Sequence, residues 1–272
     1  MTSTEDSNQL KYSDELRLYE ELVPQLVQVS DSSGGIDTTT IGIEGTKIYT
    51  RLVLSAMTIG AILPNNSVNR SGLWDFPSVA ILARSVIEAV HRYLYLIDPG
   101  ISVEEKTFRR KLHFYRINCE KYRLFSEKDD AEILKEFEDK LPLAKAKIME
   151  SPIYLGLTKN VAKKVRSGNT DMHLLDAEVS RANDLINEHF GFFYRLLSNH
   201  SHGSPFATTS QSNTRGRGTK NDAESFYLGL TVRLLNRYLS KSLLSQVELL
   251  SLHKKCAHAV DKANCVLSRA EI

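Results

Sequence analysis

Apolar residues along this chain recur mostly three and four positions apart, which is the spacing of one face of an α-helix. The first such run places Leu16, Tyr19, Leu22 and Leu26 on one face, behind Ser13 as the expected N-cap. Most of the prolines fall between these runs or at their edges. The pattern predicts helices over residues 13–29, 46–63, 78–97, 102–125, 130–149, 174–200 and 223–239, and a last one that ends near residue 267.

Turn-forming and polar segments separate these helices and set the expected organisation. We expect residues 1–12 to be disordered and residues 203–222, rich in Gly, Ser, Thr and Asn, to form a mobile loop. Residues 36–43 fit either a short strand or a loop, and no convincing pair of strands, internal repeat or long heptad run is present. The sequence therefore predicts an all-α, multi-helix bundle, arranged as one helical domain over residues 13–272.

Composition and charge exclude several classes of protein. Hydrophobic content is 42%, which is ordinary for a globular protein. The formal net charge of +2 is too small to indicate a nucleic-acid or membrane partner for the chain as a whole. The three cysteines lack metal-type spacing and are typical of reduced thiols. The start of the chain is polar and acidic, unlike a signal peptide, and the apolar segment 52–63 is too short to cross a bilayer. We expect a cytoplasmic protein with no membrane contact.

Two charges interrupt the most apolar of the predicted helices. Arg84 and Glu88 lie four positions apart, about 40° around the axis, so both side chains share one face of the helix over residues 78–97. Buried charges need partners because an unpaired one costs several kcal/mol. The two residues form either an internal ion pair or a pair that positions groups on a facing helix, and the segment Tyr194–His202 is the best candidate for that helix.

A cluster of polar residues then ends the helix predicted over residues 174–200. If the helix continues, Arg195, Asn199 and His202 project from nearly the same face, with Ser198 on the adjoining edge beside Tyr194. His200 points about 140° away from Arg195, and Gly203 followed by Pro205 ends the helix.

The chemistry of this cluster allows two interpretations. A histidine exchanges a proton near neutral pH, and an arginine binds a phosphate and stabilises charge that develops on it. Such a pair would promote attack of an RNA 2′-hydroxyl on its own phosphodiester without a metal. Alternatively, a histidine near a helix C-terminus simply interacts with the helix dipole and the terminal carbonyls.

At these residues the sequence resembles the HEPN superfamily, whose signature is Arg-x4-6-His at the end of a helix. Arg195 and His200 give the shorter spacing, and Arg195 and His202 the longer one. The chain is more closely similar to a bacterial HEPN-like family of unknown function with Arg-x3-Glu and Tyr-x3-Ser-x3-His-Gly-Ser motifs. The matching positions are Arg84, Glu88, Tyr194, Ser198, His202, Gly203 and Ser204. The resemblance covers about residues 75–205, and it departs from many active members at Leu196, where those have Asn, Asp or His.

This resemblance implies a HEPN-like helical core with flanking helices and a homodimer that cleaves RNA without metal or cofactor. It also implies a prokaryotic defence or stress system, with an antitoxin or sensor protein as a partner. Arg195 would contact the scissile phosphate, and His202 (or His200) would act as general acid or base. Ser198 and Asn199 would orient these two groups. Behind them, Arg84, Glu88 and Tyr194 would support the site without contacting the RNA.

The same residues are compatible with one other function. The alternative to a ribonuclease is a non-catalytic binding module that recognises a protein or a nucleotide through the same polar groups. A metal site is not expected, because the histidines and Glu188 near residue 200 lack a metal-binding spacing.

Overall fold

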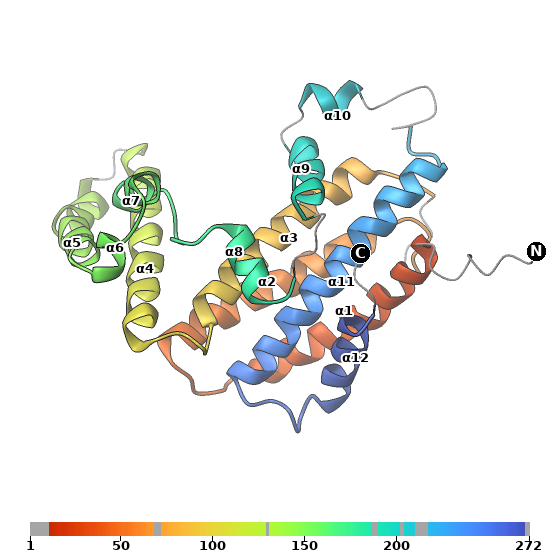
Figure 1. The fold of residues 1–272 in the computed structure, drawn as a ribbon, viewed down its shortest axis with the longest axis horizontal. Helices are drawn as coiled ribbons and strands as arrows, with labels where there is room; N and C mark the ends of the chain where they lie inside the picture. The colour runs from red at the N-terminus through yellow and green to blue at the C-terminus, as the bar shows by residue number, and fades with distance from the viewer. Residues whose placement is uncertain are drawn as a thin grey trace, which may run out of the picture. The chain divides into compact units, whose positions relative to one another are not determined.

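The computed structural model describes residues 11–67, 72–128, 131–185, 190–201, 204–209 and 217–269, and it confirms the all-α prediction (Figure 1). Among these residues no strand is present, and the only β-type pairing is an isolated bridge between Trp74 and Gly218. The helices are α1 (Tyr12–Ser33), α2 (Thr40–Ile62), α3 (Phe76–Ile97), α4 (Val103–Ser126), α5 (Ala131–Met149), α6 (Pro152–Leu155), α7 (Lys159–Arg166), α8 (Asp176–Ala182), α9 (Phe190–Ser201), α10 (Pro205–Thr209), α11 (Asp222–Leu249) and α12 (Ala257–Leu267). None of them is long and apolar enough to cross a membrane.

The chain divides into two compact units where the sequence predicted one domain. Unit 1 comprises residues 1–93 and 180–272, and unit 2 comprises residues 94–179. Helices α3 and α8 each contribute residues to both units. The division falls inside the core expected over residues 75–205, because residues 94–179 bury an apolar cluster of their own.

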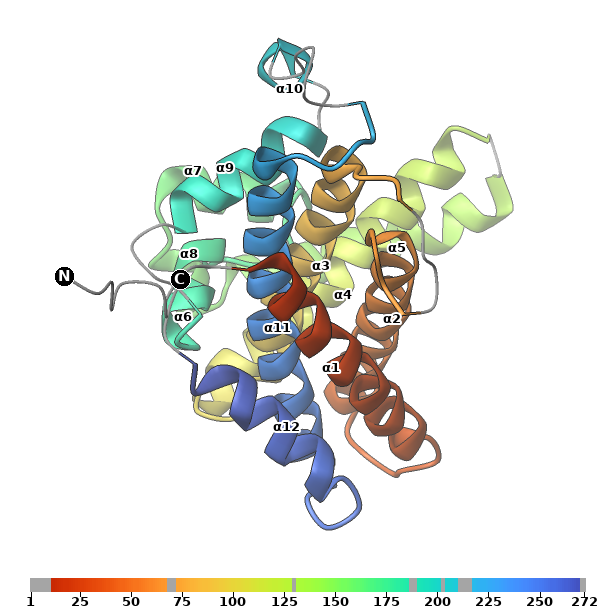
Figure 2. The same cartoon turned by 90° about the vertical axis from the view of Figure 1, so that its right-hand side faces the viewer.

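Unit 1 is organised around α11, which α1 crosses and α12 accompanies (Figure 2). Every residue from Leu228 to Val232 is buried, and consecutive residues of a helix point about 100° apart. The helix is therefore enclosed on all sides over this stretch. Two of the polar residues that α11 buries, Asn236 and Gln246, hydrogen-bond to neighbouring helices.

Tyrosine hydroxyl groups align α1 with α2. The Tyr19 hydroxyl donates to the Ala56 carbonyl at 2.8 Å, and the Tyr12 hydroxyl donates to the Pro64 carbonyl at 2.7 Å. Positions early in α1 thus meet positions late in α2, so the two helices are antiparallel. Burial of the phenol rings supplies the driving force, and the hydrogen bonds remove the cost of desolvating the hydroxyl groups.

A buried carboxylate joins α1 to α11. Glu15 is only 4% exposed, and its Oε1 accepts a hydrogen bond from Arg233 Nε at 2.9 Å. The side-chain amide of Asn236 donates to Glu15 Oε2 at 3.2 Å and to the Glu15 carbonyl at 3.0 Å. The carboxylate has exchanged water for two hydrogen bonds, and with the one to its backbone carbonyl they fix the position of α1 along α11.

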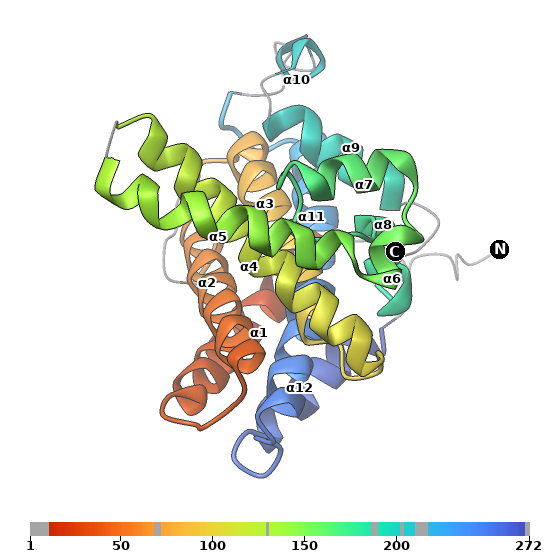
Figure 3. The same cartoon turned by 90° about the vertical axis from the view of Figure 1, so that its left-hand side faces the viewer.

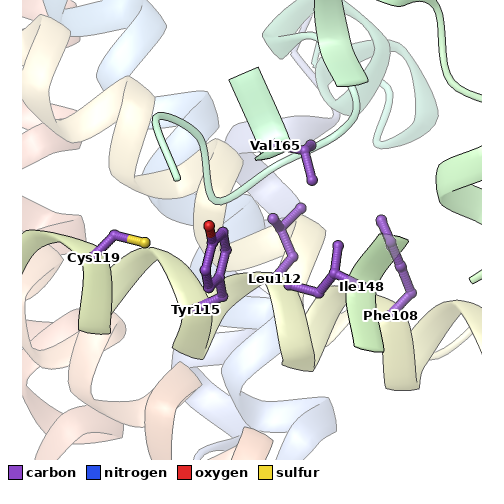
Figure 4. Close-up of a cluster of buried hydrophobic side chains, with 6 residues drawn as sticks. All are labelled: Phe108, Leu112, Tyr115, Cys119, Ile148 and Val165. Atoms are coloured by element: carbon purple, nitrogen blue, oxygen red, sulfur yellow. The ribbon is translucent and has the colours of Figure 1, made fainter. Parts of the chain in front are cut away.

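Unit 2 is held by an apolar cluster among α4, α5 and α7 (Figure 3). Along α4, Phe108, Leu112, Tyr115 and Cys119 follow the helical spacing predicted from the sequence. The close-up in Figure 4 shows Ile148 of α5 beside Leu112, with Val165 of α7 above them.

The end of α7 is fastened to α4 by arginine side chains. Arg123 Nη2 donates to the Ser167 carbonyl at 2.7 Å, and Arg116 Nη1 donates to the Gly168 carbonyl at 2.7 Å. These donors satisfy carbonyls that a helix C-terminus leaves without partners. Gly168 has φ +64°, and a Cβ there would lie 2.3 Å from Cys119 Sγ, so glycine is required on both counts.

Several sequence predictions need correction. Helix α2 begins at Thr40, inside the segment 36–43 that was expected to be a strand or a loop, and α11 continues to Leu249, past the predicted end at residue 239. The helix predicted over residues 174–200 is interrupted after Ala182, because Asp184 adopts φ +56°, which no right-handed helix accommodates. Ser13 is not an N-cap, since α1 begins at Tyr12 behind Lys11, which makes no side-chain cap. Part of the expected loop 203–222 is the short helix α10, while residues 203 and 210–216 and the expected disordered residues 1–10 lie outside the described part of the chain.

Replacing the buried carboxylate tests its contribution to unit 1. Glu15→Ala leaves Arg233 without its carboxylate and leaves Asn236 with the backbone carbonyl of residue 15 as its acceptor, and we expect the free energy of unfolding to fall by about 3 kcal/mol. Urea unfolding followed by the fluorescence of Trp74, the single tryptophan, measures this. In the control Glu21→Ala, the lost partner Lys262 lies near the surface, and the expected change is below about 1 kcal/mol. Equal losses of unfolding free energy in the two variants would show that Glu15 contributes no more than a surface carboxylate.

A buried histidine makes the stability of unit 2 depend on pH. His173 Nδ1 is 2.8 Å from the Tyr95 hydroxyl, and Nε2 is 3.3 Å from Glu105 Oε1. Burial lowers the pKa of His173; the Glu105 charge opposes this shift, and nearby Arg109 adds to it. The folded protein therefore prefers neutral imidazole, whereas the unfolded chain takes up a proton near pH 6.5.

We therefore expect the free energy of unfolding to decrease as the pH falls below about 6.5 and to level off below the folded-state pKa. Circular dichroism during urea unfolding, repeated between about pH 8 and pH 5, measures the change. His173→Asn should flatten this dependence, whereas His253→Asn, at a side chain 57% exposed, should leave it in place. If the free energy of unfolding of the wild type rises as the pH falls, the predicted direction is wrong.

Candidate functional site

Arg84 of α3 and Glu88 one turn later form an ion pair, with 2.9 Å between Arg84 Nε and Glu88 Oε1. Their side chains are 16% and 26% exposed, so the pair lies partly within unit 1. Burial by itself would lower the pKa of Arg84, but the hydrogen bond and charge of Glu88 outweigh it and raise that pKa. Arg84 therefore stays protonated and cannot act as an acid or base near neutral pH.

The same arginine reaches the facing helix, α9, which lies alongside α3 (Figure 1). Arg84 Nη1 donates to the hydroxyl oxygen of Ser198, and Nη2 lies 3.5 Å from the Tyr194 hydroxyl. The Tyr194 hydroxyl in turn donates to Glu88 Oε1 at 3.1 Å, and the guanidinium carbon lies 5.0 Å from the centre of the tyrosine ring. The structure thus brings together Arg84, Glu88, Tyr194 and Ser198, which we call the α3–α9 polar cluster.

Arg195 and His200 point in different directions, as the 140° separation predicts. Arg195 is exposed, whereas His200 is 7% exposed and meets the Phe76 ring edge-on at 4.8 Å between ring centres. The spacing Arg195-x4-His200 therefore does not produce a paired guanidinium and imidazole within one chain. His200 anchors the end of α9 to the start of α3.

Asn199 is engaged in the turn that follows α9. Its backbone carbonyl accepts from the Ser204 amide at 3.2 Å, and its side-chain oxygen accepts from the Ser204 hydroxyl at 3.3 Å. Ser204 also accepts from the Ala207 amide at 3.3 Å, which begins α10. Asn199 therefore holds the connection between α9 and α10. His202 and Gly203 lie outside the described residues, and so does Glu188.

A second group of reactive side chains, which the sequence analysis missed, lies deeper in unit 1. Ser180 Oγ is 2.5 Å from His91 Nε2 and 2.9 Å from the Tyr238 hydroxyl. All three residues are fully buried, so no substrate reaches this serine and histidine. They connect α8, α3 and α11. Only the internal position of His91 in an apolar helix hinted at such a contact.

Comparisons with protein-family models, curated proteins and solved structures find no match to the chain. Within the described part of the chain, no group of three or more His, Cys, Asp and Glu side chains is placed to hold a metal ion.

The cluster is suited to positioning more than to direct catalysis. Nε and both Nη atoms of Arg84 already face protein oxygens, and Glu88 neutralises the charge. A guanidinium so engaged has little left with which to bind a phosphate. The exposed Arg195, next in the chain to Tyr194, retains that capacity. The cluster thus fixes the face of α9 from which Arg195 is presented.

Truncating Arg84 should loosen α9 from α3. Arg84→Ala removes the cation beside Glu88 and the Arg84 contacts of Ser198 and Tyr194, and we expect a loss of about 2 kcal/mol in the local stability of α9. Hydrogen exchange of the backbone amides of residues 190–201 measures it. Arg195→Ala, an exposed arginine on the same helix, should change this exchange by less than about 0.5 kcal/mol. Similar exchange in both variants would show that the cluster does not hold the helix.

Proposed function

We propose that the protein is a HEPN-like endoribonuclease that cleaves RNA without a metal, with its reactive groups at the end of α9. The observation that supports this best is the bridge from the Arg84–Glu88 ion pair to Ser198 and Tyr194. A half-buried ionic contact of this kind orients a helix end sharply, and reacting groups need such orientation. The same proposal includes a role in a prokaryotic defence or stress system and a cytoplasmic location. It also includes a homodimer and an antitoxin or sensor protein as partner.

In the proposed reaction Arg195 binds the scissile phosphate and stabilises the charge on its oxygens. The imidazole of His202 removes the proton from the 2′-hydroxyl, whose oxygen attacks the phosphorus and displaces the 5′-oxygen of the next nucleotide. A proton returned to that oxygen completes the step. The products are a 2′,3′-cyclic phosphate and a 5′-hydroxyl, and no water or metal is consumed.

Cleavage of RNA in the presence of EDTA is the direct test. With end-labelled RNA, we expect the wild type to give products that end in a 2′,3′-cyclic phosphate, and a 2′-deoxy substitution at the cut position to abolish the cut. His202→Ala and Arg195→Ala should each lower the rate by roughly 100-fold or more. The control Arg51→Ala, at an exposed arginine of α2, should cleave like the wild type. Cleavage that is unchanged in the His202 and Arg195 variants would reject the proposal.

A non-catalytic binding module is the second candidate, and the burial of His200 and the neutralisation of Arg84 favour it. As such a module, the protein would recognise a protein or a nucleotide partner, and the wild type would cleave no RNA under any tested condition. If the partner is RNA, filter binding with the same end-labelled RNA should show wild-type binding that weakens in Arg195→Ala. Light scattering of the purified protein tests the proposed homodimer.

A further inference from the structure

A cavity of about 920 Å³ lies in unit 1, and no residue of the α3–α9 polar cluster lines it. The start of α1, the residues after α2, Trp74 and the start of α11 line it. Its volume is in the range of small-molecule sites in proteins, roughly 300–1,000 Å³. Segments that are distant in the sequence therefore form one concave site large enough for a nucleotide.

Aromatic side chains form the apolar part of this cavity. Trp74 is 3% exposed and is held in place by the Tyr12 ring, 5.1 Å away, and by a hydrogen bond from its backbone amide to the Gly218 carbonyl at 3.0 Å. Phe226 of α11 also lines the cavity, yet 51% of it is exposed. An exposed phenyl ring beside a cavity offers a planar face on which a nucleobase stacks.

Cations of two helix starts surround the aromatic part. Lys11, Arg17 and Lys220 line the cavity and are exposed, and Lys220 Nζ lies 5.7 Å from the centre of the Trp74 ring. Two carboxylates line it as well. Glu20 Oε1 accepts the Ser67 backbone amide at 2.5 Å, and Asp222 lies in the first turn of α11, where the helix dipole partly offsets its charge. Cations thus outnumber carboxylates, and one carboxylate is already hydrogen-bonded.

We propose that this cavity binds one nucleotide unit, with its base on Phe226 and its phosphate at Lys11, Arg17 and Lys220. Exposed cations beside an exposed aromatic ring match the two chemically different ends of a nucleotide, a phosphate and a planar base. Glu20 and Asp222 offer acceptors for the amino groups of a base or the hydroxyl groups of the ribose. The nucleotide is either free or part of single-stranded RNA.

Ring contacts link the end of α9 to α11, whose first residues line the cavity. The Phe76 ring meets the His200 ring edge-on and stacks on Tyr227, with 5.4 Å between the Phe76 and Tyr227 ring centres and 25° between their planes. Trp74 and Phe226, which line the cavity, are close neighbours of Phe76 and Tyr227 in the chain. If the source is RNA, the bound nucleotide flanks the scissile bond; this part rests on the proposed function, and nucleotide binding itself does not.

The single tryptophan of the chain lies in the cavity, so its fluorescence reports binding directly. We would titrate the full chain with AMP, with adenosine, and with a 2′-O-methyl oligonucleotide of adenosine that cannot be cleaved through the 2′-oxygen. We expect a saturable fluorescence change with a phosphate-bearing ligand and a weaker response to adenosine. A much tighter apparent affinity for the oligonucleotide than for AMP identifies RNA as the source, and similar affinities identify a free nucleotide.

Matched variants locate the ligand. Phe226→Ala should weaken binding by roughly tenfold or more, and Lys220→Ala and Arg17→Ala should weaken it and reduce its dependence on salt. Phe192→Ala, at another exposed phenylalanine that does not line the cavity, and Arg51→Ala should bind like the wild type. All these side chains are exposed, and circular dichroism verifies that each variant is folded.

No saturable change with AMP or the oligonucleotide, or unchanged affinity in both Phe226→Ala and Lys220→Ala, would overturn the proposal. Its failure is distinct from that of the ribonuclease proposal, because the ligands used are not cleaved. Arg195→Ala and His202→Ala should therefore retain AMP binding whether or not the wild type cleaves RNA.

Discussion

The need to pair every charge that enters the helical interior governs this structure. Glu15 enters between α1 and α11 and is held by Arg233 and Asn236. Arg109 of α4 is 5% exposed, and it donates to Glu105 and to the Tyr95 carbonyl. Removing a charge from water costs several kcal/mol, which only close, well-directed partners offset. Such partners are available in one arrangement of the helices, so these contacts select that arrangement from others that would bury similar apolar area.

The α3–α9 polar cluster follows from the same constraint. Arg84 is partly buried, and the chain supplies it with Glu88 on its own helix and with Ser198 and Tyr194 on the next. The guanidinium becomes a fixed connector between two helices, and its capacity for an external anion is correspondingly low. Arg195, which is exposed, keeps that capacity. One arginine is thus structural and the other chemically available, although both belong to the motifs that suggested a site.

Ring contacts connect the end of α9 with α11, whose start lines the proposed nucleotide cavity. His200, Phe76 and Tyr227 pack in succession, and the chain neighbours of Phe76 and Tyr227 line the cavity. These contacts tie the helix that carries Arg195 to the helix that carries Phe226.

The sequence by itself determined the helical class, most helix positions and the Arg84–Glu88 pair, because these depend on spacings of three or four residues. It also indicated that Arg195 and His200 diverge, which follows from helical geometry alone. Only the tertiary structure decided that the helix expected over residues 174–200 is interrupted at Asp184, that residues 94–179 form a separate unit, and that Phe76 covers His200. It likewise gathered the cavity from segments some 200 residues apart. Contacts between residues so far apart in the sequence depend on how whole helices pack, and the local spacing of apolar residues does not predict them.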